Sequence, residues 1–364
     1  MKIAYDARSL DHGGTGDATY FRELISALAR TNPADEYLLY ADAPDSAREE
    51  LASAFANVIT HSLPYRIGLL WNQTDLVPQL ERQGVRLLHS QYILPWRFRG
   101  KLIVTIHDVS FLEHPEWFPP RLRMVKKLLI PRAARRADVV ITGSEYSCQA
   151  IARTCRVSLD KIIVTPYAAG VWARPVNVEE HQDILQKYFL ETPFLLGVGL
   201  RDVRKNVQII IKALDILSQR NNVPNIKLAL CGSVEQFPAE VASHPNVQFL
   251  GWVPQEDLPQ LYAHAAAAVY PSLYEGFGLP VLEAMACGCP MICSNATSLP
   301  EVAGDAALQI DPHDAGAWAD GIAKVLLDEA LREKMISDGL TRAQKFSWER
   351  TARETREIYL SLMD

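Results

Sequence analysis

Short apolar runs alternate with amphipathic patterns along almost the whole chain. In its first part, apolar runs bounded by polar residues predict buried strands. These strands are expected at residues 2–7, 36–41, 86–89, 102–106, 139–142 and 162–165. Between the first two, residues 17–30 place apolar side chains on one face of a helix. Strands and helices that alternate in this way predict a parallel sheet built from βαβ units.

A second series of the same kind follows a connecting stretch, residues 171–192, which carries a proline and a charged segment. Strands are then expected at residues 194–198, 226–230, 247–250, 266–270, 290–293 and 307–310. The 364 residues of the chain exceed the size at which one hydrophobic core keeps growing. We therefore predict an α/β protein with two Rossmann-like domains, residues 1–170 and 193–346, joined by the linker 171–192. A last helix is expected over 347–364.

Composition narrows the class of protein only slightly. An apolar fraction of 48% and a charged fraction of 22% are ordinary for a soluble globular protein. The net charge of −6 gives no general reason to expect nucleic-acid binding. The sequence contains no apolar run of membrane-spanning length, and it does not begin with the apolar core of a signal peptide. We therefore expect a cytoplasmic protein.

The stretch from Tyr274 to Ala286 combines a strand end, a glycine-containing turn and a helix start. The first N–H groups of a helix lack intrahelical partners, and the helix dipole adds partial positive charge there, so this arrangement favours an anion. Glu275 lies in the turn and Glu283 in the helix that follows. Because a carboxylate repels a phosphate, these two side chains are expected to bind sugar hydroxyls. The stretch therefore predicts a site for a phosphorylated sugar, and a well-capped structural helix is the alternative.

Glu275 to Glu283 resembles the Glu-x7-Glu motif of retaining GT-B glycosyltransferases. The surrounding Glu-Gly-Phe-Gly-Leu-Pro and Glu-Ala-Met-Ala-Cys-Gly-Cys-Pro are similar to glycosyltransferase family four. The resemblance implies a GT-B fold, in which two Rossmann-like domains with parallel sheets face each other across a cleft. The first domain would take the acceptor, the second would bind the nucleotide sugar, and the last helix would cross back onto the first domain.

The resemblance also implies roles for individual residues of this stretch. Glu283 would bind the ribose of the nucleotide, and Glu275 would bind a hydroxyl of the donor sugar. The backbone of the turn and of the helix start would hold the sugar and the phosphate, through Gly276, Phe277, Gly278 and Leu279.

A cationic turn follows the first strand of the second domain. A diphosphate leaving group needs positive charge as its bond to the sugar breaks, and Arg, Lys and helix ends can supply it. The turn is similar to the family element Gly-Arg-Leu-x3-Lys-Asn, in which Lys205 matches the lysine and Gly199 lies close to the donor. Leu200 occupies the place of the arginine. Arg201 or Arg204 would take that role, and a solvated loop is the alternative.

We expect the reaction to need no metal ion and no cofactor. No Asp-x-Asp element stands at a convincing strand end, and the six cysteines have no metal-like spacing. The nucleotide diphosphate sugar would be the co-substrate, with GDP-mannose as the first candidate.

Three further segments resemble donor-binding elements of the family. His107 follows a strand at the sheet edge where open α/β proteins bind ligands, and it resembles the histidine that reaches the donor sugar. Gly14 and Gly16 resemble the glycine-rich first loop, where ligand can approach the backbone. Val253 lies in the loop expected to contact the nucleobase. The alternatives are a structural histidine, an ordinary tight turn, and a loop whose tryptophan, Trp252, packs on a neighbour.

Residues 121–136 hold seven Arg or Lys side chains and no acid. Leu122, Val125, Leu128 and Leu129 form an apolar stripe at helical spacing, and Pro131 is expected to break or kink the helix. A basic amphipathic helix can lie on an anionic membrane surface. The alternative is that the stripe packs on its own sheet and leaves the charges in water.

Together these features and the resemblance predict a metal-independent glycosyltransferase, and the resemblance implies that it retains the anomeric configuration. It would move a hexose, with mannose as the first candidate, from a nucleotide sugar to a hydroxyl of a glycan or a lipid-linked oligosaccharide. Catalysis would involve Glu275, His107, Lys205 and Arg201. If the enzyme inverted the configuration instead, it would need a positioned base, for which Asp108 is the nearest candidate. A nucleotide-sugar epimerase and a non-catalytic nucleotide-sugar-binding protein are the alternative functions.

Overall fold

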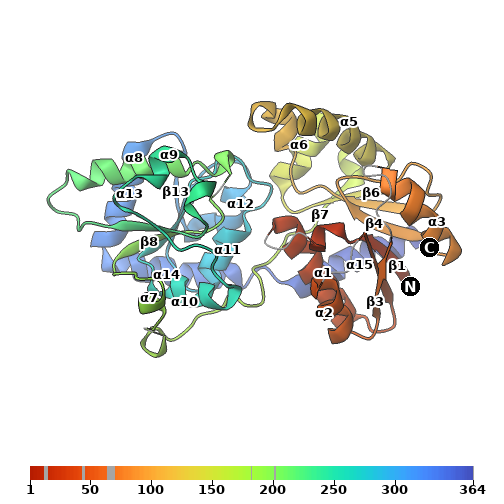
Figure 1. The fold of residues 1–364 in the computed structure, drawn as a ribbon, viewed down its shortest axis with the longest axis horizontal. Helices are drawn as coiled ribbons and strands as arrows, with labels where there is room; N and C mark the ends of the chain where they lie inside the picture. Colours follow the sequence, from red (N-terminus) through yellow and green to blue (C-terminus); the bar gives the residue numbers. More distant parts are fainter. Residues whose placement is uncertain (12–14, 43–45, 64–69, 182, 201, 364) are drawn as a thin grey trace. The chain divides into compact units, whose positions relative to one another are not determined.

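The computed structural model describes residues 1–11, 15–42, 46–63, 70–181, 183–200 and 202–363. The chain divides into two units of similar size (Figure 1). The first unit comprises Met1–Tyr167 together with Ser347–Asp364, and the second comprises Ala168–Phe346. Each unit is described by itself below.

In the described part of the first unit, seven parallel strands form one sheet in the order β3-β2-β1-β4-β5-β6-β7. The strands are β1 (Lys2–Asp6), β2 (Glu36–Ala41), β3 (Val58–Ser62), β4 (Leu87–Gln91), β5 (Lys101–Thr105), β6 (Val139–Thr142) and β7 (Ile162–Val164). The strand order reverses between β1 and β4, so a topological switch point lies at their carboxyl ends. The expected strands of this unit are confirmed, and β3 is an additional one.

Helices cover both faces of this sheet (Figure 1). One face carries α1 (Gly16–Thr31), α2 (Ser46–Ala54) and α15 (Trp348–Met363), and the other carries α3 (Val77–Arg82), α5 (Pro120–Arg136) and α6 (Glu145–Cys155). Short helical turns complete the unit at η1 (Arg8–Asp11), η3 (Asn72–Leu76), α4 (Ser110–Glu113), η4 (Pro115–Trp117) and η5 (Leu159–Lys161). The C-terminal helix α15 packs beside α1, and the hydroxyls of Tyr5 and Tyr359 lie 2.8 Å apart.

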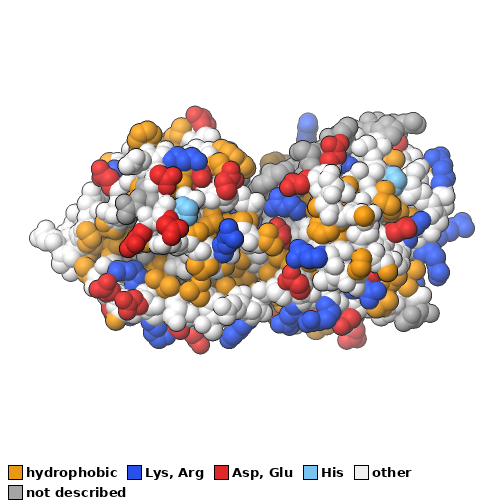
Figure 2. Space-filling model, turned by 90° about the horizontal axis from the view of Figure 1, so that it is seen from below, with side chains coloured by type: hydrophobic (Ala, Val, Ile, Leu, Met, Phe, Trp, Pro, Cys, Tyr) orange, Lys and Arg blue, Asp and Glu red, His pale blue; other side chains and the backbone are white. Residues whose placement is uncertain are grey.

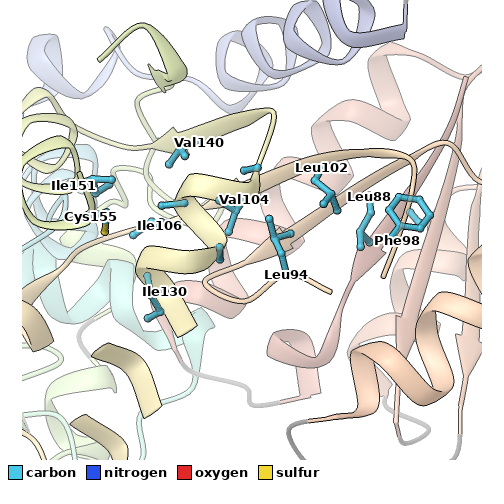
Figure 3. Close-up of a cluster of buried hydrophobic side chains, with 14 of the residues drawn as sticks. Leu88, Leu94, Phe98, Leu102, Val104, Ile106, Ile130, Val140, Ile151 and Cys155 are labelled. Atoms are coloured by element: carbon cyan, nitrogen blue, oxygen red, sulfur yellow. The ribbon is translucent and has the colours of Figure 1, made fainter. Parts of the chain in front are cut away.

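The core of the first unit lies between the sheet and the helices α5 and α6. Figure 3 shows side chains of β4, β5 and β6 meeting those of the two helices. Val104 and Val140 are fully buried here, and Ile130 of α5 and Ile151 of α6 cover them. Because each fully buried aliphatic side chain contributes about 1.5–3 kcal/mol, this layer fixes the sheet from which the loops of the first unit project.

In the described part of the second unit, six parallel strands form a sheet in the order β10-β9-β8-β11-β12-β13. The strands are β8 (Phe194–Gly197), β9 (Lys227–Leu230), β10 (Val247–Phe249), β11 (Ala267–Tyr270), β12 (Met291–Ser294) and β13 (Leu308–Ile310). All of them match expected strands. The order reverses between β8 and β11, which places a second switch point at the carboxyl ends of these two strands.

Helices also cover both faces of the second sheet (Figure 1). One face carries α8 (Val207–Ser218), α9 (Ala239–Ala242) and α13 (Ala315–Leu327), and the other carries α7 (Asp183–Lys187), α10 (Leu258–His264), α11 (Leu279–Ala286) and α14 (Glu329–Ala343). The remaining helical segments are α12 (Leu299–Ala303), η6 (Val178–Glu180), η7 (Val203–Lys205), η8 (Val234–Gln236), η9 (Gln255–Asp257) and η10 (Gly304–Ala306). Segment 171–192, predicted as a linker, lies in this unit, where Lys187 Nζ contacts Asp257 Oδ2 at 2.6 Å.

Helix α5 differs from its expected form in one respect. It continues through Pro131, so the expected break does not occur, and a kink stays a prediction. Burial of Ile130, Ala133 and Ala134 on either side of the proline holds this part of the helix against the sheet, which compensates for the lost backbone hydrogen bond. No helix within the described ranges combines the length and the apolar content that crossing a bilayer requires.

Acidic and basic side chains are interspersed with hydrophobic ones over the face of the molecule drawn in Figure 2. Mixed charge of this kind agrees with the small net charge of −6. Along the sequence, segment 121–136 departs from this mixture of charges, because it contains basic residues and no acidic one.

Candidate functional site

A lysine and a glutamate meet at the switch point of the second unit. Lys205 ends η7 in the turn after β8, and Glu275 lies in the turn after β11. Lys205 Nζ lies 2.6 Å from Glu275 Oε1, and the two side chains are 16% and 11% exposed. In open α/β sheets, ligands bind outside the carboxyl ends of the strands at such a point. The ion pair therefore marks the candidate site.

Further hydrogen bonds fix the two charged groups. Lys205 Nζ donates to the hydroxyl of Tyr270 at 2.5 Å and lies 4.9 Å from the centre of that ring. The hydroxyl of Ser272 also donates to Glu275 Oε1. Burial, reinforced by the Glu275 carboxylate, raises the pKa of Tyr270 well above its usual value, so the phenol stays protonated. A buried ion pair persists only when its remaining hydrogen-bonding capacity is satisfied in this way.

Asn206 connects the two turns that carry this pair. Its backbone has a positive φ of 53°, which asparagine tolerates better than most residues. The side-chain amide donates to the carbonyls of Pro271, at 3.2 Å, and Pro312, at 2.8 Å. The N–H of Leu273 donates to the carbonyl of Arg204 at 2.7 Å. The Asn206 amide and this backbone hydrogen bond thus hold the two turns together and set the position of Lys205 relative to Glu275.

Residues that follow β12 hold the glycine turn after Glu275 through hydrogen bonds. Glu275 N–H donates to Thr297 Oγ1 at 3.0 Å, and the hydroxyl of Ser298 donates to the carbonyls of Glu275 and Phe277, at 3.1 and 2.9 Å. Gly278 has a φ of 108°, and a Cβ there would lie 2.5 Å from a methyl carbon of Leu299. Glycine is therefore required by the local geometry alone.

The side chains of this turn point into the second unit. Phe277 is buried, and its ring packs edge-on against Phe346 with centroids 6.0 Å apart. Gly278 is the N-cap of α11, whose first residue is Leu279. Since Phe277 is occupied with packing, the groups that this turn can offer to a ligand belong to its backbone.

Glu283 lies on α11, and its side chain is buried within the second unit. Burial raises the pKa of Tyr270, and the charges of both Glu275 and Glu283 raise it further. Two residues eight positions apart thus act electrostatically on one phenol. The helix start between them brings both carboxylates to the same region of the second unit.

The cationic turn after β8 places its residues differently. Leu200, which stands at the family's arginine position, is 1% exposed and packs beside Gly197. Arg204 Nη2 lies 3.1 Å from Asp202 Oδ2. Burial would raise the pKa of Asp202, but hydrogen bonds from Arg204 outweigh it and lower that pKa. Arg201 lies outside the described residues.

Gly199 and Gly251, in two loops expected to contact the donor, are among the glycines of the second unit that have a positive φ. Gly199 has a φ of 71° and Gly251 a φ of 67°, and a Cβ added to either residue would meet no atom of the described part of the chain within 4 Å. The carbonyl of Gly251 accepts from the N–H of Gly232 at 2.8 Å. In the loop expected to contact the nucleobase, Val253 is 8% exposed whereas Trp252 is 74% exposed. Trp252 therefore does not pack on a neighbour.

In the first unit, His107 follows β5 and is 11% exposed. Its Nδ1 lies 2.7 Å from the hydroxyl of Tyr167, and its Nε2 lies 2.7 Å from Gln91 Oε1. Burial lowers the pKa of His107, although Asp17 and Asp108 oppose this change. The imidazole is therefore neutral near pH 7.

Gly16 is the first residue of α1, and Thr15 caps this helix by accepting from Ala18 N–H at 3.2 Å. Among the described residues, no atom lies within 4 Å of a Cβ added to Gly16, and its φ is outside the left-handed region. The turn itself therefore does not require glycine here. Gly14 lies outside the described residues.

Asp108 has a structural task beside His107. Its Oδ1 accepts from the N–H of Ser110 at 2.8 Å and from the hydroxyl of the same residue at 2.6 Å. This carboxylate thus holds Ser110, the first residue of the short helix α4. Within the described ranges, no group of three or more His, Cys, Asp or Glu side chains is placed to hold a metal ion, and metal independence stays a prediction.

Sequence reasoning missed the polar residues that support the predicted ones. Tyr270 and Ser272 hold Lys205 and Glu275, and Gln91 and Tyr167 hold His107. A usable signal existed for Tyr270 and Gln91, because each is the last residue of a strand next to a switch point. For Ser272 and Tyr167 the sequence offers no comparable signal.

Comparison with known proteins connects this geometry to one family. The family model described as "Glycosyl transferases group 1" matches residues 165–342, and "Glycosyltransferase Family 4" matches residues 14–168. The sequence is 33% identical to the O-antigen chain mannosyltransferase B of Escherichia coli, over 99% of both chains. It is 31% identical to the serotype-specific mannosyltransferase WbdA of Escherichia coli, over 74% of this chain and 34% of that protein.

Solved structures resemble the fold over its whole length. HepE of Anabaena, in complex with UDP and glucose, matches with a TM-score of 0.78 and 19% identity over 99% of this chain and 100% of that one. Sucrose-phosphate synthase of Thermosynechococcus elongatus matches with a TM-score of 0.77 and 22% identity over 100% and 99%. At such identities the likeness concerns the fold alone.

Proposed function

The chain belongs to the glycosyl transferases group 1 family and has a GT-B-type fold, and we propose that it transfers mannose from GDP-mannose to a hydroxyl of a polysaccharide. Mannose is supported by the two mannosyltransferases of Escherichia coli that resemble the chain. The observation that supports a transferase site is the Lys205–Glu275 ion pair, which lies at the switch point between β8 and β11. GDP-mannose is the first donor to test.

The second unit would bind the donor through the residues around this pair. Glu275 would accept a hydrogen bond from a sugar hydroxyl, and Glu283 would bind the ribose. The ammonium of Lys205 would stabilise the negative charge that develops on the diphosphate. Arg204 would assist, because Leu200 is buried and cannot carry this charge. Arg201 stays a proposal for the same role.

Backbone groups would make the remaining donor contacts. The N–H groups of the turn Gly276–Leu279 lie at the N-terminus of α11, where the helix dipole favours an anion. Gly199 and Val253 would contact the diphosphate and the nucleobase, and Gly16 of the first unit has open space beside its backbone. These contacts would fix the donor, and because every residue carries similar backbone groups, the sequence of these loops does not reveal which base they bind.

We infer that transfer retains the anomeric configuration, as the family resemblance implies. The bond between the anomeric carbon and the phosphate oxygen breaks, and the acceptor oxygen bonds to that carbon on the same face. The departing phosphate oxygen takes the acceptor's proton, so this route needs no separate base. An inverting route would need one, and Asp108 Oδ1 already accepts two hydrogen bonds from Ser110. The stereochemistry of the product decides between the routes.

The acceptor would be a glycan or a lipid-linked oligosaccharide at a membrane surface. Three apolar side chains of α5 are exposed, namely Leu122 at 43%, Met124 at 68% and Leu128 at 50%. They share the N-terminal half of this helix with Arg121, Arg123 and Lys127, which are also exposed. Anionic lipids attract such a helix through its charges, and its apolar face inserts into the headgroup region.

The test is transfer and hydrolysis with a panel of nucleotide sugars in the presence of EDTA. We expect saturable binding of GDP-mannose and slow release of GDP without acceptor, and both Glu275→Ala and Lys205→Ala should suppress the release. Lys334→Ala is the matched control, because Lys334 forms an ion pair with Asp338 on the surface of the same unit. Failure of all nucleotide sugars to bind, or wild-type behaviour of both site variants, would refute the proposed site.

The same experiment separates the alternative functions. An epimerase would change the sugar of the donor without any acceptor, and a non-catalytic binding protein would bind the donor and release no nucleotide. Loss of activity in EDTA, restored by a divalent cation, would overturn metal independence.

A further inference from the structure

The side chain of Gln91 contacts His107 and also two residues of the N-terminal segment, Ser9 and Asp17. This residue ends β4, beside the switch point between β1 and β4. Its Oε1 lies 2.7 Å from His107 Nε2. Its Nε2 donates to Ser9 Oγ at 2.9 Å and to the carbonyl oxygen of Asp17 at 3.1 Å. Ser9 precedes residues 12–14 in the chain, and Asp17 follows them.

These contacts determine which ring nitrogen of His107 carries the proton. The carbonyl oxygen of Asp17 can only accept, so the atom of Gln91 that faces it must be the amide nitrogen. The amide oxygen of Gln91 therefore faces His107, and His107 Nε2 must donate to it. In a neutral imidazole the other nitrogen is then an acceptor. The hydroxyl of Tyr167 accordingly donates to His107 Nδ1, at 2.7 Å.

The surroundings of the ring keep it neutral. Tyrosine rings lie edge-on or tilted around it, with centroid distances of 5.0 Å for Tyr20, 5.6 Å for Tyr92 and 5.5 Å for Tyr167. The charged and titratable groups that face the imidazole are Asp17, whose Oδ1 lies 3.6 Å from Nε2, together with Asp108, His89 and these tyrosines. Burial lowers the pKa of His107 against the two carboxylates.

We propose that Gln91 is a positioning residue that holds His107 as the neutral Nε2–H tautomer and couples this ring to Ser9 of η1 and Asp17 of α1. One amide group then fixes the imidazole, the turn η1 and the start of α1 in a single arrangement before the donor binds. Tyr167 completes the arrangement from the other ring nitrogen. The inference deepens the proposed function and rests on it: the donor would approach Gly16, and His107 would reach the donor sugar, as the family resemblance implies.

The first experiment reads the tautomer directly and needs no substrate. Long-range ¹H–¹⁵N spectra of the imidazole distinguish the two neutral tautomers and the imidazolium, and the loss of one signal in His107→Gln assigns it. We expect the Nε2–H tautomer at neutral pH in the wild type. In Gln91→Leu the signal should shift toward a mixture of tautomers. A wild-type spectrum of the Nδ1–H tautomer or of the imidazolium would overturn the inference.

The second experiment measures transfer by variants that remove single parts of the arrangement. Gln91→Glu keeps an oxygen acceptor toward Nε2–H but cannot donate to Asp17 O. Gln91→Leu loses both functions. Misplacement of a reacting group by about 1 Å can cost about a hundredfold in rate, so we expect kcat to fall by about tenfold or more in Gln91→Leu. Gln91→Glu should lie between this variant and the wild type.

A matched control separates positioning from stability. Tyr167→Phe removes the hydroxyl that donates to His107, whereas Tyr40→Phe removes an equally short bond to Gln83 Oε1, at 2.6 Å, elsewhere in the same unit. Tyr167→Phe should lower kcat and alter the imidazole spectrum, and Tyr40→Phe should change neither. If Gln91→Leu and Tyr167→Phe keep wild-type kcat and KM, Gln91 has no positioning role.

The two experiments also distinguish the two proposals. If the spectra show the Nε2–H tautomer and its dependence on Gln91 but no nucleotide sugar is turned over, the proposed function fails and the assigned arrangement stands. If transfer occurs and the tautomer is the other one, the proposed function stands and the inference fails.

Discussion

Lys205 Nζ lies 2.6 Å from Glu275 Oε1, although 70 positions separate the two residues in the chain. The contact joins the turns after β8 and β11, where the order of the second sheet reverses. Each charge holds the other in place in the absence of a ligand. A donor would find a carboxylate for its hydroxyl and an ammonium for its phosphate already positioned, which limits the reorganisation that the reaction requires.

Removal of one member of this pair should destabilise the second unit and abolish transfer. A single substitution, Glu275→Gln or Lys205→Met, leaves the other charge unpaired in a largely buried place. Such a change costs up to about 3–5 kcal/mol when the pair is fully buried, and the partial exposure here should reduce that cost. Chemical denaturation measures the loss of unfolding free energy, and release of GDP from GDP-mannose measures activity.

The double variant separates the two effects. Lys205→Met with Glu275→Gln removes both charges, so it should recover part of the stability lost by either single variant. Transfer should stay absent, because the groups for the sugar and the diphosphate are both gone. A double variant that regained transfer would show that the pair is structural and that the donor binds elsewhere.

Substitution by alanine should affect the unfolding free energy differently at Gly16 and at Gly278. Gly278→Ala places a Cβ 2.5 Å from a Leu299 methyl and forces an alanine to a φ of 108°, so the unfolding free energy should fall by about 2 kcal/mol or more. Gly16→Ala meets no atom within 4 Å and replaces glycine in a helix, so stability should hold or rise.

Activity gives the second readout of Gly16→Ala. If the donor approaches the backbone here, the added methyl group should raise KM for the nucleotide sugar severalfold while the melting temperature is unchanged. Unchanged kinetics would assign Gly16 to the start of α1 alone.

The local pattern of apolar and polar residues was sufficient to predict most of the fold. Buried strands such as β8 and β11 are continuous apolar runs, and their burial on both faces produces this pattern. Strand β3 (Val58–Ser62) was missed because it lies at the edge of its sheet and carries polar residues, including His61. Its pairing with β2 depends on residues about twenty positions away, which a short stretch of sequence around β3 does not contain.

The candidate site was only partly predictable, for a related reason. The turn from Glu275 to Gly278 carries its chemistry in consecutive residues, so the sequence reveals it. The partners of these residues come from distant segments, as Thr297 and Ser298 do for the glycine turn. The inward orientation of Leu200 also follows from packing against β8 and β9, which no motif encodes.

Helix α5 should bind anionic vesicles through its N-terminal half. Leu128→Gln with Met124→Gln removes exposed apolar surface, and Arg123→Gln with Lys127→Gln removes two charges, each contributing about 1 kcal/mol near an anionic surface. Both pairs should weaken sedimentation with vesicles of phosphatidylglycerol and phosphatidylcholine. Binding by the wild type should fall as salt rises.

The control for this surface is an exposed leucine of the second unit. Leu327 is 54% exposed, and Leu327→Gln should leave vesicle binding unchanged. Equal binding to vesicles of phosphatidylcholine alone would contradict an electrostatic contribution, and loss of binding in the Leu327 variant would show that the surface is elsewhere.

The stability of the first unit should decline in mild acid because of His89. This side chain is buried, with Nδ1 2.7 Å from the Tyr359 hydroxyl and Nε2 2.7 Å from Thr105 Oγ1. Burial, aided by the nearby His107, lowers the pKa of His89 to about 3, against about 6.5 in an unfolded chain. Below pH 6.5 the unfolded state therefore binds a proton that the folded state does not.

The sign and size of the effect follow from this difference. Stability rises with pH wherever the unfolded state binds more protons, by about 1.4 kcal/mol per pH unit and group. His89 should thus cost about 2 kcal/mol between pH 8 and pH 5, provided that its folded pKa stays below 5. The lowered pKa of His107 adds a contribution of the same sign.

Urea denaturation of the wild type and of His89→Asn at pH 8, 6.5 and 5 measures this contribution. Asparagine does not titrate, so the variant should be less stable at pH 8 through altered contacts but should lose less stability between pH 8 and pH 5. The two stability curves should therefore converge as the pH falls. Parallel curves would mean that His89 accepts a proton in the folded state as readily as in the unfolded one, and the tyrosine network around it would then have to accommodate a buried imidazolium.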